Sequence, residues 1–329
     1  MRPRLTAFIV TPAPRGSRHG NRVTALRWAW RLRELGLRVR MAEAWTGEPC
    51  DVLVALHALR SHASIQRHAR QLPAEPRIVA LTGTDLYGDI HSNADARESL
   101  ELATRLVLLQ PLGLRQLPLR LHDKTLTIRQ SASAPVASRA PSATGTLEVC
   151  VMGHLRDVKA PFLAAEAARL LPAGSRVRIS HLGAALDASM RARAEAASKA
   201  SEGRWTWLGE RSRLEALRFL AGSDLLVLTS AQEGGANVVT EAIACGVPVV
   251  STRIEGSLGI LGEDYPGYVE PGDAAELARM LARCETESEL LSSLRARCNA
   301  LRTLVDPSRE RESWRRLLGE IIPEAARST

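Results

Sequence analysis

The chain has 329 residues, of which 45% are hydrophobic and 4% aromatic, and its formal net charge is +8. This length exceeds that of a usual single hydrophobic core, so two domains are expected. No run of eighteen apolar residues occurs, and the apolar segment from Leu5 to Val10 is too short for a signal peptide, which predicts a cytoplasmic protein without stable membrane insertion. The five cysteines lack metal-ligand spacing, so we expect reduced, mostly buried thiols and no structural zinc site.

The positive charge belongs to the first part of the chain. Up to Gly145 there are 21 basic and 11 acidic residues, a difference of +10, whereas the remainder has 23 and 25, a difference of −2. Such an excess attracts anionic ligands. A nucleic acid is not the expected ligand, because the arginines are dispersed and no nucleic-acid-binding motif is present.

Apolar runs alternate with helical periodicity along the chain and predict two α/β domains with doubly wound parallel sheets. In the first half, strands are expected at Leu5–Val10, Arg38–Ala42, Val52–His57, Arg77–Leu81, Arg105–Leu109 and Thr125–Ile128. An amphipathic helix is expected from about Asn21 to Leu35. In the second half, strands are expected at Leu147–Met152, Arg176–His181, Thr206–Trp207, Asp224–Thr229 and Pro248–Ser251.

A small, polar stretch from Gln130 to Thr146, interrupted by Pro135, Pro141 and Gly145, has the composition of an interdomain linker. We therefore expect an N-terminal domain at residues 1–135, a linker at residues 136–146 and a C-terminal domain at residues 147–305. The remaining residues, 306–329, contain apolar side chains at helical spacing and predict a final helix that packs back across the domain junction.

The loop after the first strand lies where the carboxyl ends of parallel strands form ligand crevices. Gly16 permits close backbone approach there, and Arg18, His19 and Arg22 follow it. Each of these side chains alone is better explained as a solvated charge, but together on a glycine loop they are candidates for an anion site. The loop lacks Gly-x-Gly-x-x-Gly, and no acidic residue follows the second strand at dinucleotide spacing, which disfavours NAD binding.

The most informative segment is GSDLLVLTSAQEGGANVVTEAIACGVPVVST, residues 222–252. It predicts a buried strand, a turn at Gly234, Gly235 and Ala236, a helix that begins near Asn237, and a second buried strand. The N–H groups and positive dipole end of that helix would bind a phosphate. Two carboxylates, Glu233 and Glu241, bracket the turn. The alternative is an ordinary strand–helix–strand unit with two surface glutamates.

This segment resembles the nucleotide-sugar half of GT-B glycosyltransferases of the retaining family-4 type, in which two glutamates separated by seven residues precede an Ala-x-Gly-x-Pro-Val-Val strand entry. Glu233 and Glu241 fit that spacing. The resemblance implies two Rossmann-like domains facing a central cleft. It further implies that Glu233 is catalytic and meets the hydroxyls of the donor sugar, that Glu241 meets the ribose, and that the loop of Gly16 faces the donor phosphates.

The segment VMGHLRDVKAP supplies a second part of the family pattern, which is Gly-Arg-Leu followed by a spaced lysine. Gly153, Leu155 and Lys159 fit it, so the resemblance assigns Lys159 to the diphosphate leaving group; a salt-bridged lysine at a helix start is the alternative. His154 occupies the usual arginine position, and either it or Arg156 would contact the phosphates. Because no Asp-x-Asp pair occurs, we expect neither a metal nor a cofactor apart from the UDP-sugar co-substrate.

Four further strings are GSRHGNRVTALRWAWRLRELG, LVALHALRSHASIQRHA, LTGTDLYGDI and EGGANVVTEA. They resemble the selenosugar synthases of selenoneine biosynthesis, a branch of this fold. That resemblance implies the joining of selenophosphate to the sugar of UDP-N-acetylglucosamine or UDP-glucose, with release of UDP and phosphate. The candidate acceptor-binding residues are Arg18, His19, Arg22, Arg60, Thr84, Asp85 and Arg129. The alternatives are a family-4 enzyme with a hydroxyl acceptor and a nucleotide-sugar sensor; the oligomeric state is not predicted.

Overall fold

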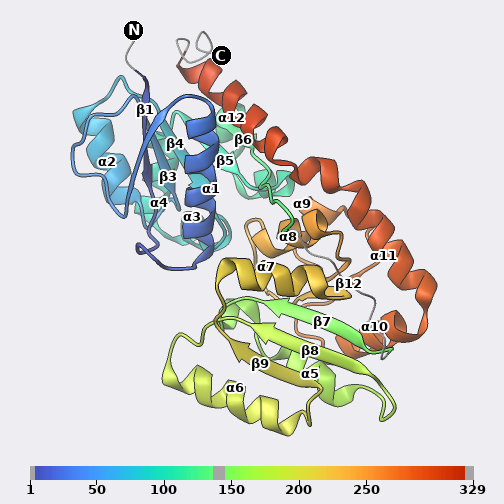
Figure 1. Ribbon diagram of the computed structural model, residues 1–329. Helices are drawn as coiled ribbons and strands as arrows, with labels where there is room; N and C mark the ends of the chain where they lie inside the picture. Colours follow the sequence, from blue (N-terminus) through green and yellow to red (C-terminus); the bar gives the residue numbers. More distant parts are fainter. Residues whose placement is uncertain (1–3, 136–144, 323–329) are drawn as a thin grey trace. The chain divides into compact units, whose positions relative to one another are not determined.

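The computed structural model describes residues 4–135 and 145–322, and its contacts divide the chain into two compact units (Figure 1). Unit 1 contains the described residues up to Ser131 together with those from Pro307 onward, and unit 2 runs from Ala132 to Asp306. Each unit is built on one six-stranded sheet. Most of the segment expected as a linker, residues 136–144, lies outside the described residues.

The sheet of unit 1 is wholly parallel, in the order β2-β1-β3-β4-β5-β6. Its strands are β1 (Thr6–Val10), β2 (Arg38–Ala42), β3 (Val52–Leu56), β4 (Arg77–Leu81), β5 (Arg105–Leu108) and β6 (Thr125–Thr127). The connecting helices are α1 (Gly20–Glu34), α2 (His62–Gln71), the π-helical turn η1 (Asp85–Asp89), α3 (Ile90–Ser92), α4 (Ala94–Leu102) and the 3-10 turns η2 (Pro111–Gln116) and η3 (Leu119–Lys124). Because every strand runs the same way, the loops that follow the strands share one edge of the sheet.

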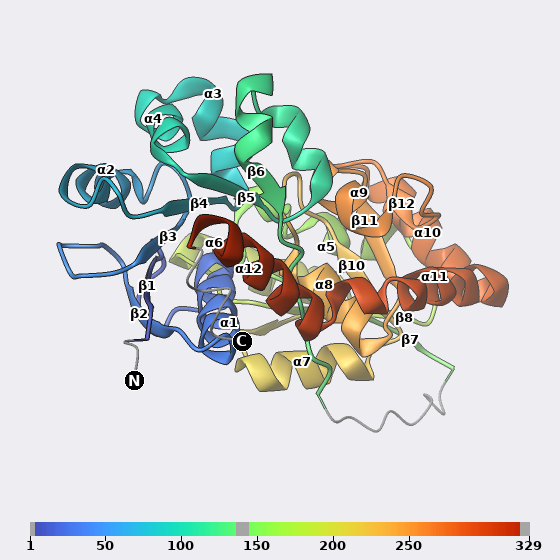
Figure 2. The same ribbon diagram turned by 90° about the horizontal axis from the view of Figure 1, so that it is seen from above.

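Successive side chains along these strands point to opposite faces of the sheet, so unit 1 has two hydrophobic cores, one on each face. Ile9 and Val54 pack with Trp28 of α1 and Trp314 of the last helix, α12 (Pro307–Ile321), whereas Phe8 and Leu53 pack with Ile65 of α2. Figures 1 and 2 show α12 beside α1, although these helices stand at opposite ends of the sequence. The C-terminal helix is therefore a structural part of the N-terminal unit.

A buried carboxylate joins α12 to α1. Glu310 accepts a hydrogen bond from Trp28 Nε1 at 3.0 Å, from Arg27 Nε at 3.0 Å and from Ser131 Oγ at 2.5 Å. Its side chain has no exposed surface, and that of Arg27 is 10% exposed. The rings of Trp28 and Trp314 meet edge to face, with centroids 5.0 Å apart. A charge buried to this degree is stable only because its partners are in place.

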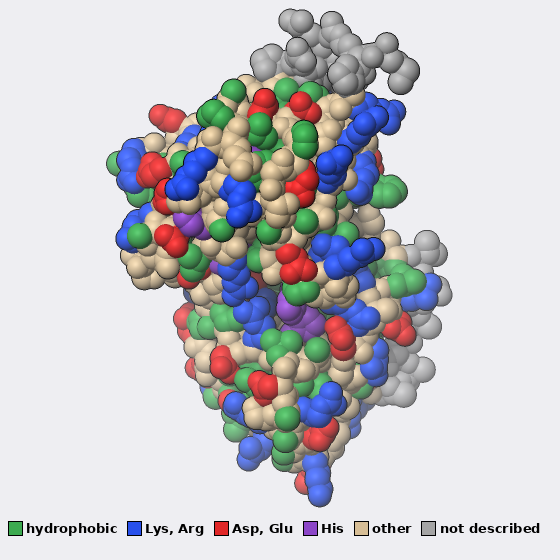
Figure 3. Space-filling model, turned by 90° about the vertical axis from the view of Figure 1, so that its left-hand side faces the viewer, with side chains coloured by type: hydrophobic (Ala, Val, Ile, Leu, Met, Phe, Trp, Pro, Cys, Tyr) green, Lys and Arg blue, Asp and Glu red, His purple; other side chains and the backbone are tan. Residues whose placement is uncertain are grey.

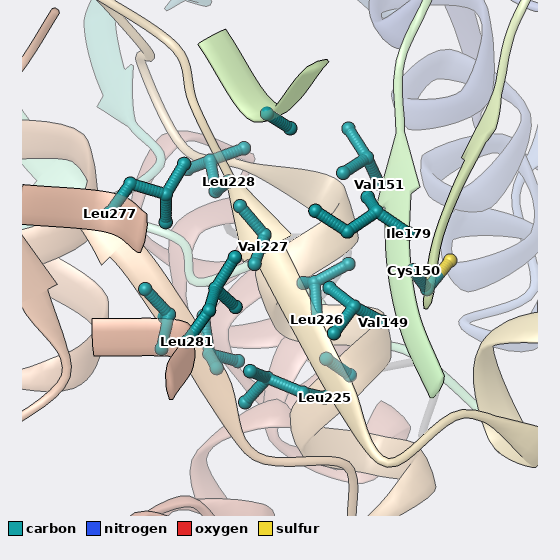
Figure 4. Packing of buried hydrophobic residues seen from close by; sticks show 14 of the residues in the cluster. Val149, Cys150, Val151, Ile179, Leu225, Leu226, Val227, Leu228, Leu277 and Leu281 are labelled. Atoms are coloured by element: carbon teal, nitrogen blue, oxygen red, sulfur yellow. The ribbon is translucent and has the colours of Figure 1, made fainter. Parts of the chain in front are cut away.

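The sheet of unit 2 is also parallel, in the order β12-β11-β10-β7-β8-β9. Its strands are β7 (Leu147–Met152), β8 (Val177–Leu182), β9 (Trp205–Gly209), β10 (Leu225–Leu228), β11 (Val249–Thr252) and β12 (Tyr268–Val269). Its helices are the 3-10 turn η4 (Asp157–Lys159), α5 (Leu163–Leu170), α6 (Ala188–Ala200), α7 (Arg213–Gly222), α8 (Asn237–Cys245), α9 (Glu255–Leu261), α10 (Ala274–Thr286), α11 (Ser288–Ala300) and η5 (Arg302–Val305). Figure 4 shows Leu226 and Val227 of the central strand β10 packed among Val149, Ile179 and Leu281.

All strands expected from the sequence are present, with ends that shift by one or two residues, and the first and last helices are confirmed. The strand β12 was not expected, because a two-residue strand has no periodicity; it forms through its pairing with Ser251 and Thr252 of β11. All five cysteines are free, and four of them are buried, as expected. Among the described residues, no helix has the length and apolarity that crossing a membrane requires. On the face drawn in Figure 3, basic and acidic side chains are interspersed.

Candidate functional site

In unit 2, two loops form one surface at the carboxyl edge of the sheet. The first follows β7 and includes Gly153 to Ala160; the second follows β10 and leads into α8. They are tied together by two hydrogen bonds: Ala231 N donates to Val158 O at 2.9 Å, and Thr229 Oγ1 donates to Lys159 O at 2.8 Å. The pairing of β7 with β10 therefore brings together two segments that are distant in sequence.

Lys159 and Glu233 meet on this surface. The ammonium group of Lys159 forms an ion pair with the Glu233 carboxylate, and Ser230 Oγ donates to the same carboxylate oxygen at 2.7 Å. The side chains of Lys159 and Glu233 are 31% and 11% exposed, so the pair is reachable from solvent at the lysine. Ala160 has φ 41°, a left-handed conformation that disfavours a residue with a Cβ atom, and it fixes the turn that carries Lys159.

Residues of β11 and α9 contact the loop that carries Glu233. Thr252 Oγ1 donates to Ser230 O at 2.6 Å. Gly256 packs so closely that a Cβ atom placed on it would lie 2.1 Å from the carbonyl oxygen of Glu233. Only glycine fits this contact without displacing the loop, so the position of Glu233 depends on Gly256.

Helix α8 begins at Asn237, and its N-cap residue, Ala236, provides no side-chain cap. The positive end of the helix dipole is therefore directed at the turn that contains Gly234 and Gly235. Glu241 lies in the second turn of α8, only 5% exposed, and Arg213 Nη1 at the start of α7 lies 2.8 Å from its Oε1. Both carboxylates are thus paired with cations, which allows an anion to approach this edge.

The turn at Gly153 and His154 is fixed by the loop that follows β8. His154 Nδ1 accepts a hydrogen bond from Ala184 N at 3.0 Å. A Cβ atom on Gly183 would lie 1.9 Å from the Gly153 carbonyl oxygen, and His181 Nε2 donates to that same oxygen at 2.9 Å. Burial lowers the pKa of His181 to about 4, so this histidine is neutral near pH 7.

The candidate donor residues from Gly153 to Lys159 and from Glu233 to Glu241 therefore lie on adjoining loops and the first turns of α8. His154 bonds to backbone through Nδ1, whereas no ion pair of the half-buried Arg156 is present among residues 4–135 and 145–322. The sequence reasoning missed Arg213. No local pattern identifies it, because its contact with Glu241 arises only when α7 packs beside α8.

In unit 1, His57 and Thr84 meet at the carboxyl edge of the other sheet. His57 Nε2 lies 3.0 Å from Thr84 Oγ1 and 3.7 Å from Asp89 Oδ2. His57 has φ 76°, an uncommon conformation for a residue other than glycine, and burial lowers its pKa. The sequence analysis names His57 only as the end of an expected strand; its left-handed backbone and its carboxylate neighbours make it a further candidate for the acceptor side.

The Asp85 carboxylate accepts hydrogen bonds from the loops after β3 and β4, near His57. Asp85 is fully buried, and its carboxylate accepts these hydrogen bonds from Ala58 N at 2.9 Å, Thr82 N at 2.8 Å and Gly83 N at 2.8 Å. These bonds give Asp85 a turn-forming role, whereas the sequence analysis names it as a candidate for acceptor binding. Asp85 thus joins the loop after β3 to the loop after β4.

The candidate arginines follow different strands of the same sheet. Arg18 and Arg22 follow β1, together with His19, the N-cap residue of α1, and Arg60 follows the neighbouring strand β3. Arg129 follows β6, three strands from β3 in the sheet, which corresponds to about 14 Å at the usual strand spacing. Gly16 has φ 85°, which its loop requires. The sheet order thus groups the first two arginines with Arg60 and sets Arg129 apart.

The chain is similar to known proteins in sequence and in fold. Residues 138–300 match the family model described as Glycosyl transferases group 1. N-acetyl-alpha-D-glucosaminyl L-malate synthase of Bacillus anthracis is 36% identical over 90 residues, which cover 27% of this chain and 23% of that protein. The lipopolysaccharide core biosynthesis glycosyltransferase LpsE of Rhizobium meliloti is 38% identical over 80 residues, 24% of each chain. The matched regions thus span about a quarter of these curated relatives.

Solved structures resemble the chain over nearly its whole length. Anabaena HepE, determined in complex with UDP, superposes with a TM-score of 0.78 at 16% identity, covering 96% of this chain and all of that one (100%). Sucrose-phosphate synthase from Thermosynechococcus elongatus superposes with a TM-score of 0.76 at 14% identity, covering 98% and 100%. The expected fold class, GT-B with two Rossmann-like parallel-sheet domains, is confirmed.

Proposed function

We propose that this chain, whose residues 138–300 match the group 1 glycosyltransferase family model, transfers a sugar from a UDP-sugar to a small anionic acceptor. The observation that carries the proposal is the edge of unit 2, where an uncapped helix start, the Lys159 ammonium and two cation-paired glutamates adjoin. Such a helix start binds phosphate, and a lysine stabilises the charge that develops on a leaving diphosphate. The UDP and UDP-glucose complexes of HepE, a protein of the same fold, support this choice of donor.

Each donor residue has a distinct role in this proposal. Lys159, with Arg156 or His154, neutralises the diphosphate as the bond between the sugar and its oxygen breaks. Glu233 accepts hydrogen bonds from hydroxyls of the sugar, and Glu241 accepts them from the ribose. The ion pair with Arg213 holds the Glu241 carboxylate in place. The transfer step requires no metal and no cofactor, because these cations and the helix dipole supply the electrostatic stabilisation that a metal provides elsewhere.

For the acceptor we propose selenophosphate, which makes the protein a selenosugar synthase. The support is the resemblance of its N-terminal strings to that branch and the arginines Arg18, Arg22 and Arg60 on neighbouring strands, which suit a phosphoryl group. Selenium attacks the anomeric carbon, the bond to UDP breaks, and a sugar selenophosphate and UDP result. Water then cleaves the phosphorus–selenium bond and gives the selenosugar and phosphate. The selenium is already anionic, so the first step needs no general base.

The second candidate is a hydroxyl acceptor, and one observation favours it. His57 is held 3.7 Å from Asp89, and burial lowers its pKa, which favours the neutral form that a general base for a hydroxyl proton requires. The similarity to a glucosaminyl malate synthase is consistent with such an acceptor.

One experiment separates the candidates. The full chain is incubated with UDP-N-acetylglucosamine or UDP-glucose and selenophosphate, with and without EDTA, and the products are identified by mass spectrometry. We expect UDP, phosphate and a selenosugar, formed equally with EDTA present. Transfer to an alcohol acceptor without selenium supports the second candidate. Binding of UDP without turnover of any acceptor identifies a sensor and rejects both.

Gly256→Ala is expected to lower UDP-sugar turnover by about 100-fold, the usual cost of displacing a site residue by about an ångström. The added Cβ atom would lie 2.1 Å from the carbonyl oxygen of Glu233, so the loop has to move. The matched control is Gly222→Ala, because no atom lies within 4 Å of a Cβ atom there. The measurement is the UDP-sugar turnover of both variants in steady-state kinetics, with circular dichroism to verify folding. Equal rates would mean that the Glu233 loop is not part of the site.

A further inference from the structure

A histidine and two carboxylates meet on the surface of unit 1. His62 is the first residue of α2, and Asp95 and Glu98 lie in the first turns of α4. His62 Nε2 lies 3.2 Å from Glu98 Oε2 and 3.8 Å from Asp95 Oδ1, and one ligand atom from each residue lies within 4.8 Å of the others. The histidine side chain is 12% exposed and the carboxylates are 62% and 45% exposed, so the group is open to solvent on the acidic side.

The hydrogen bonds of Ser99 determine which ring nitrogen of His62 carries the proton. Ser99 is fully buried, and its hydroxyl has two carbonyl acceptors, Ala58 O at 2.8 Å and Asp95 O at 3.0 Å. The single hydroxyl proton is therefore used by a carbonyl, and His62 Nδ1, 3.0 Å from Ser99 Oγ, has to be the donor in that contact. With Nδ1 as the donor, Nε2 faces the two carboxylates, so that a bound cation would be shared by all three side chains.

We propose that His62, Asp95 and Glu98 bind a divalent transition-metal ion of the zinc type. In a tetrahedral zinc site with bonds of about 2.0 Å, neighbouring ligand atoms are about 3.3 Å apart, which matches the separation of Nε2 from the Glu98 carboxylate. A histidine whose second nitrogen donates to a fixed acceptor is the usual arrangement at such sites, since this bond selects the tautomer and orients the ring. Water completes the coordination on the exposed side.

The ion would join α2 to α4. Through the hydrogen bond from Ser99 to Ala58 O, it would also stabilise the loop that carries His57 and Arg60. The site is distinct from the donor edge of unit 2, and its occupancy does not depend on the proposed transfer reaction. No spacing motif indicates it, because the ligands come from two helices that are far apart in the sequence.

The test is a calorimetric titration of the chelator-stripped full chain with zinc chloride at pH 7.5, together with Co²⁺ absorption as a report of histidine ligation. We expect one ion per chain, and an affinity at least about tenfold weaker in His62→Gln and in Glu98→Gln. The controls are Glu101→Gln, on the same helix but paired with Arg120, and His91→Ala, an exposed histidine of the same unit.

Thermal unfolding provides a second measurement that does not involve turnover. Zinc is expected to raise the melting temperature of the wild type and of both controls, but not that of Glu98→Gln. If zinc binds equally to the wild type and to His62→Gln, or does not bind at all, the proposal is wrong and His62 contacts the two carboxylates without a shared metal ion. Either result leaves the transfer assay unaffected, so failure here is distinguishable from failure of the proposed function.

Discussion

Lys159→Ala is expected to lower UDP-sugar turnover by about 100- to 1000-fold while the protein remains folded, the usual loss when one preorganised charge-stabilising group is removed. Lys159 places its ammonium group at the edge of the sheet where α8 begins. The Glu233 carboxylate pairs with its side chain, and the Thr229 hydroxyl donates a hydrogen bond to its backbone carbonyl. The lysine side chain is 31% exposed, so removing it leaves the core intact. The measurement is kcat with saturating donor, accompanied by circular dichroism.

The loss has to be separated from the effect of leaving Glu233 without its partner. We expect Lys159→Ala combined with Glu233→Gln to be at least as slow as Lys159→Ala, because the missing charge is the one that faces the diphosphate. Recovery of activity in the double variant would instead show that the lysine only balances Glu233. Lys199→Ala, at an exposed lysine on α6 of the same unit, is the control and should keep wild-type kinetics.

Glu310→Ala is expected to reduce the free energy of unfolding by about 3–5 kcal/mol, the usual cost of removing one partner from a buried ion pair. The variant leaves the nearly buried Arg27 guanidinium without its carboxylate and removes the acceptor of Trp28 Nε1 and Ser131 Oγ. Unfolding in urea, followed by tryptophan fluorescence, measures the loss. Faster amide hydrogen exchange in α12 locates it at the contact between α12 and α1.

The control for this loss lies on the same helix. The side chain of Glu312 is 45% exposed and pairs with Arg315 three residues away, so Glu312→Ala should change stability by less than about 1 kcal/mol. Glu310→Gln retains an acceptor for the tryptophan and the serine, and we expect it to fall between the two. Equal stability of the two alanine variants would mean that the buried carboxylate does not hold α12 in unit 1.

Much of the fold was predictable because the information is local. The apolar runs of β3 and β10 are buried along their whole length, and such runs between turn residues indicate parallel strands wherever they occur. The Ser212 capping box of α7 and the Asp273 cap of α10 mark helix starts in the same way. The strand β12 was not predictable in this way, because it has only two residues and forms through its pairing with β11.

The candidate site was predictable only in its donor half. There, the turn, the helix start and the two glutamates lie within one continuous segment, so their proximity follows from chain connectivity. The acceptor candidates are spread over four loops, and their grouping depends on strand order. The order β1-β3-β4-β5-β6 allows Arg18 and Arg60 to follow neighbouring strands but separates Arg129 from them, and no single-strand pattern contains that order.

The sequence by itself determined the two sheets, the strand–turn–helix unit before Glu241 and the basic excess of the first half, because periodicity, glycine turns and charge are properties of neighbouring residues. Only the tertiary structure decided that Lys159 pairs with Glu233, that Arg213 pairs with Glu241, and that His62 lies between two carboxylates of another helix. These contacts join elements that are far apart in sequence. Their geometry is set by the parallel pairing of strands and by helix packing, which minimise the free energy of the whole chain and not of any one segment.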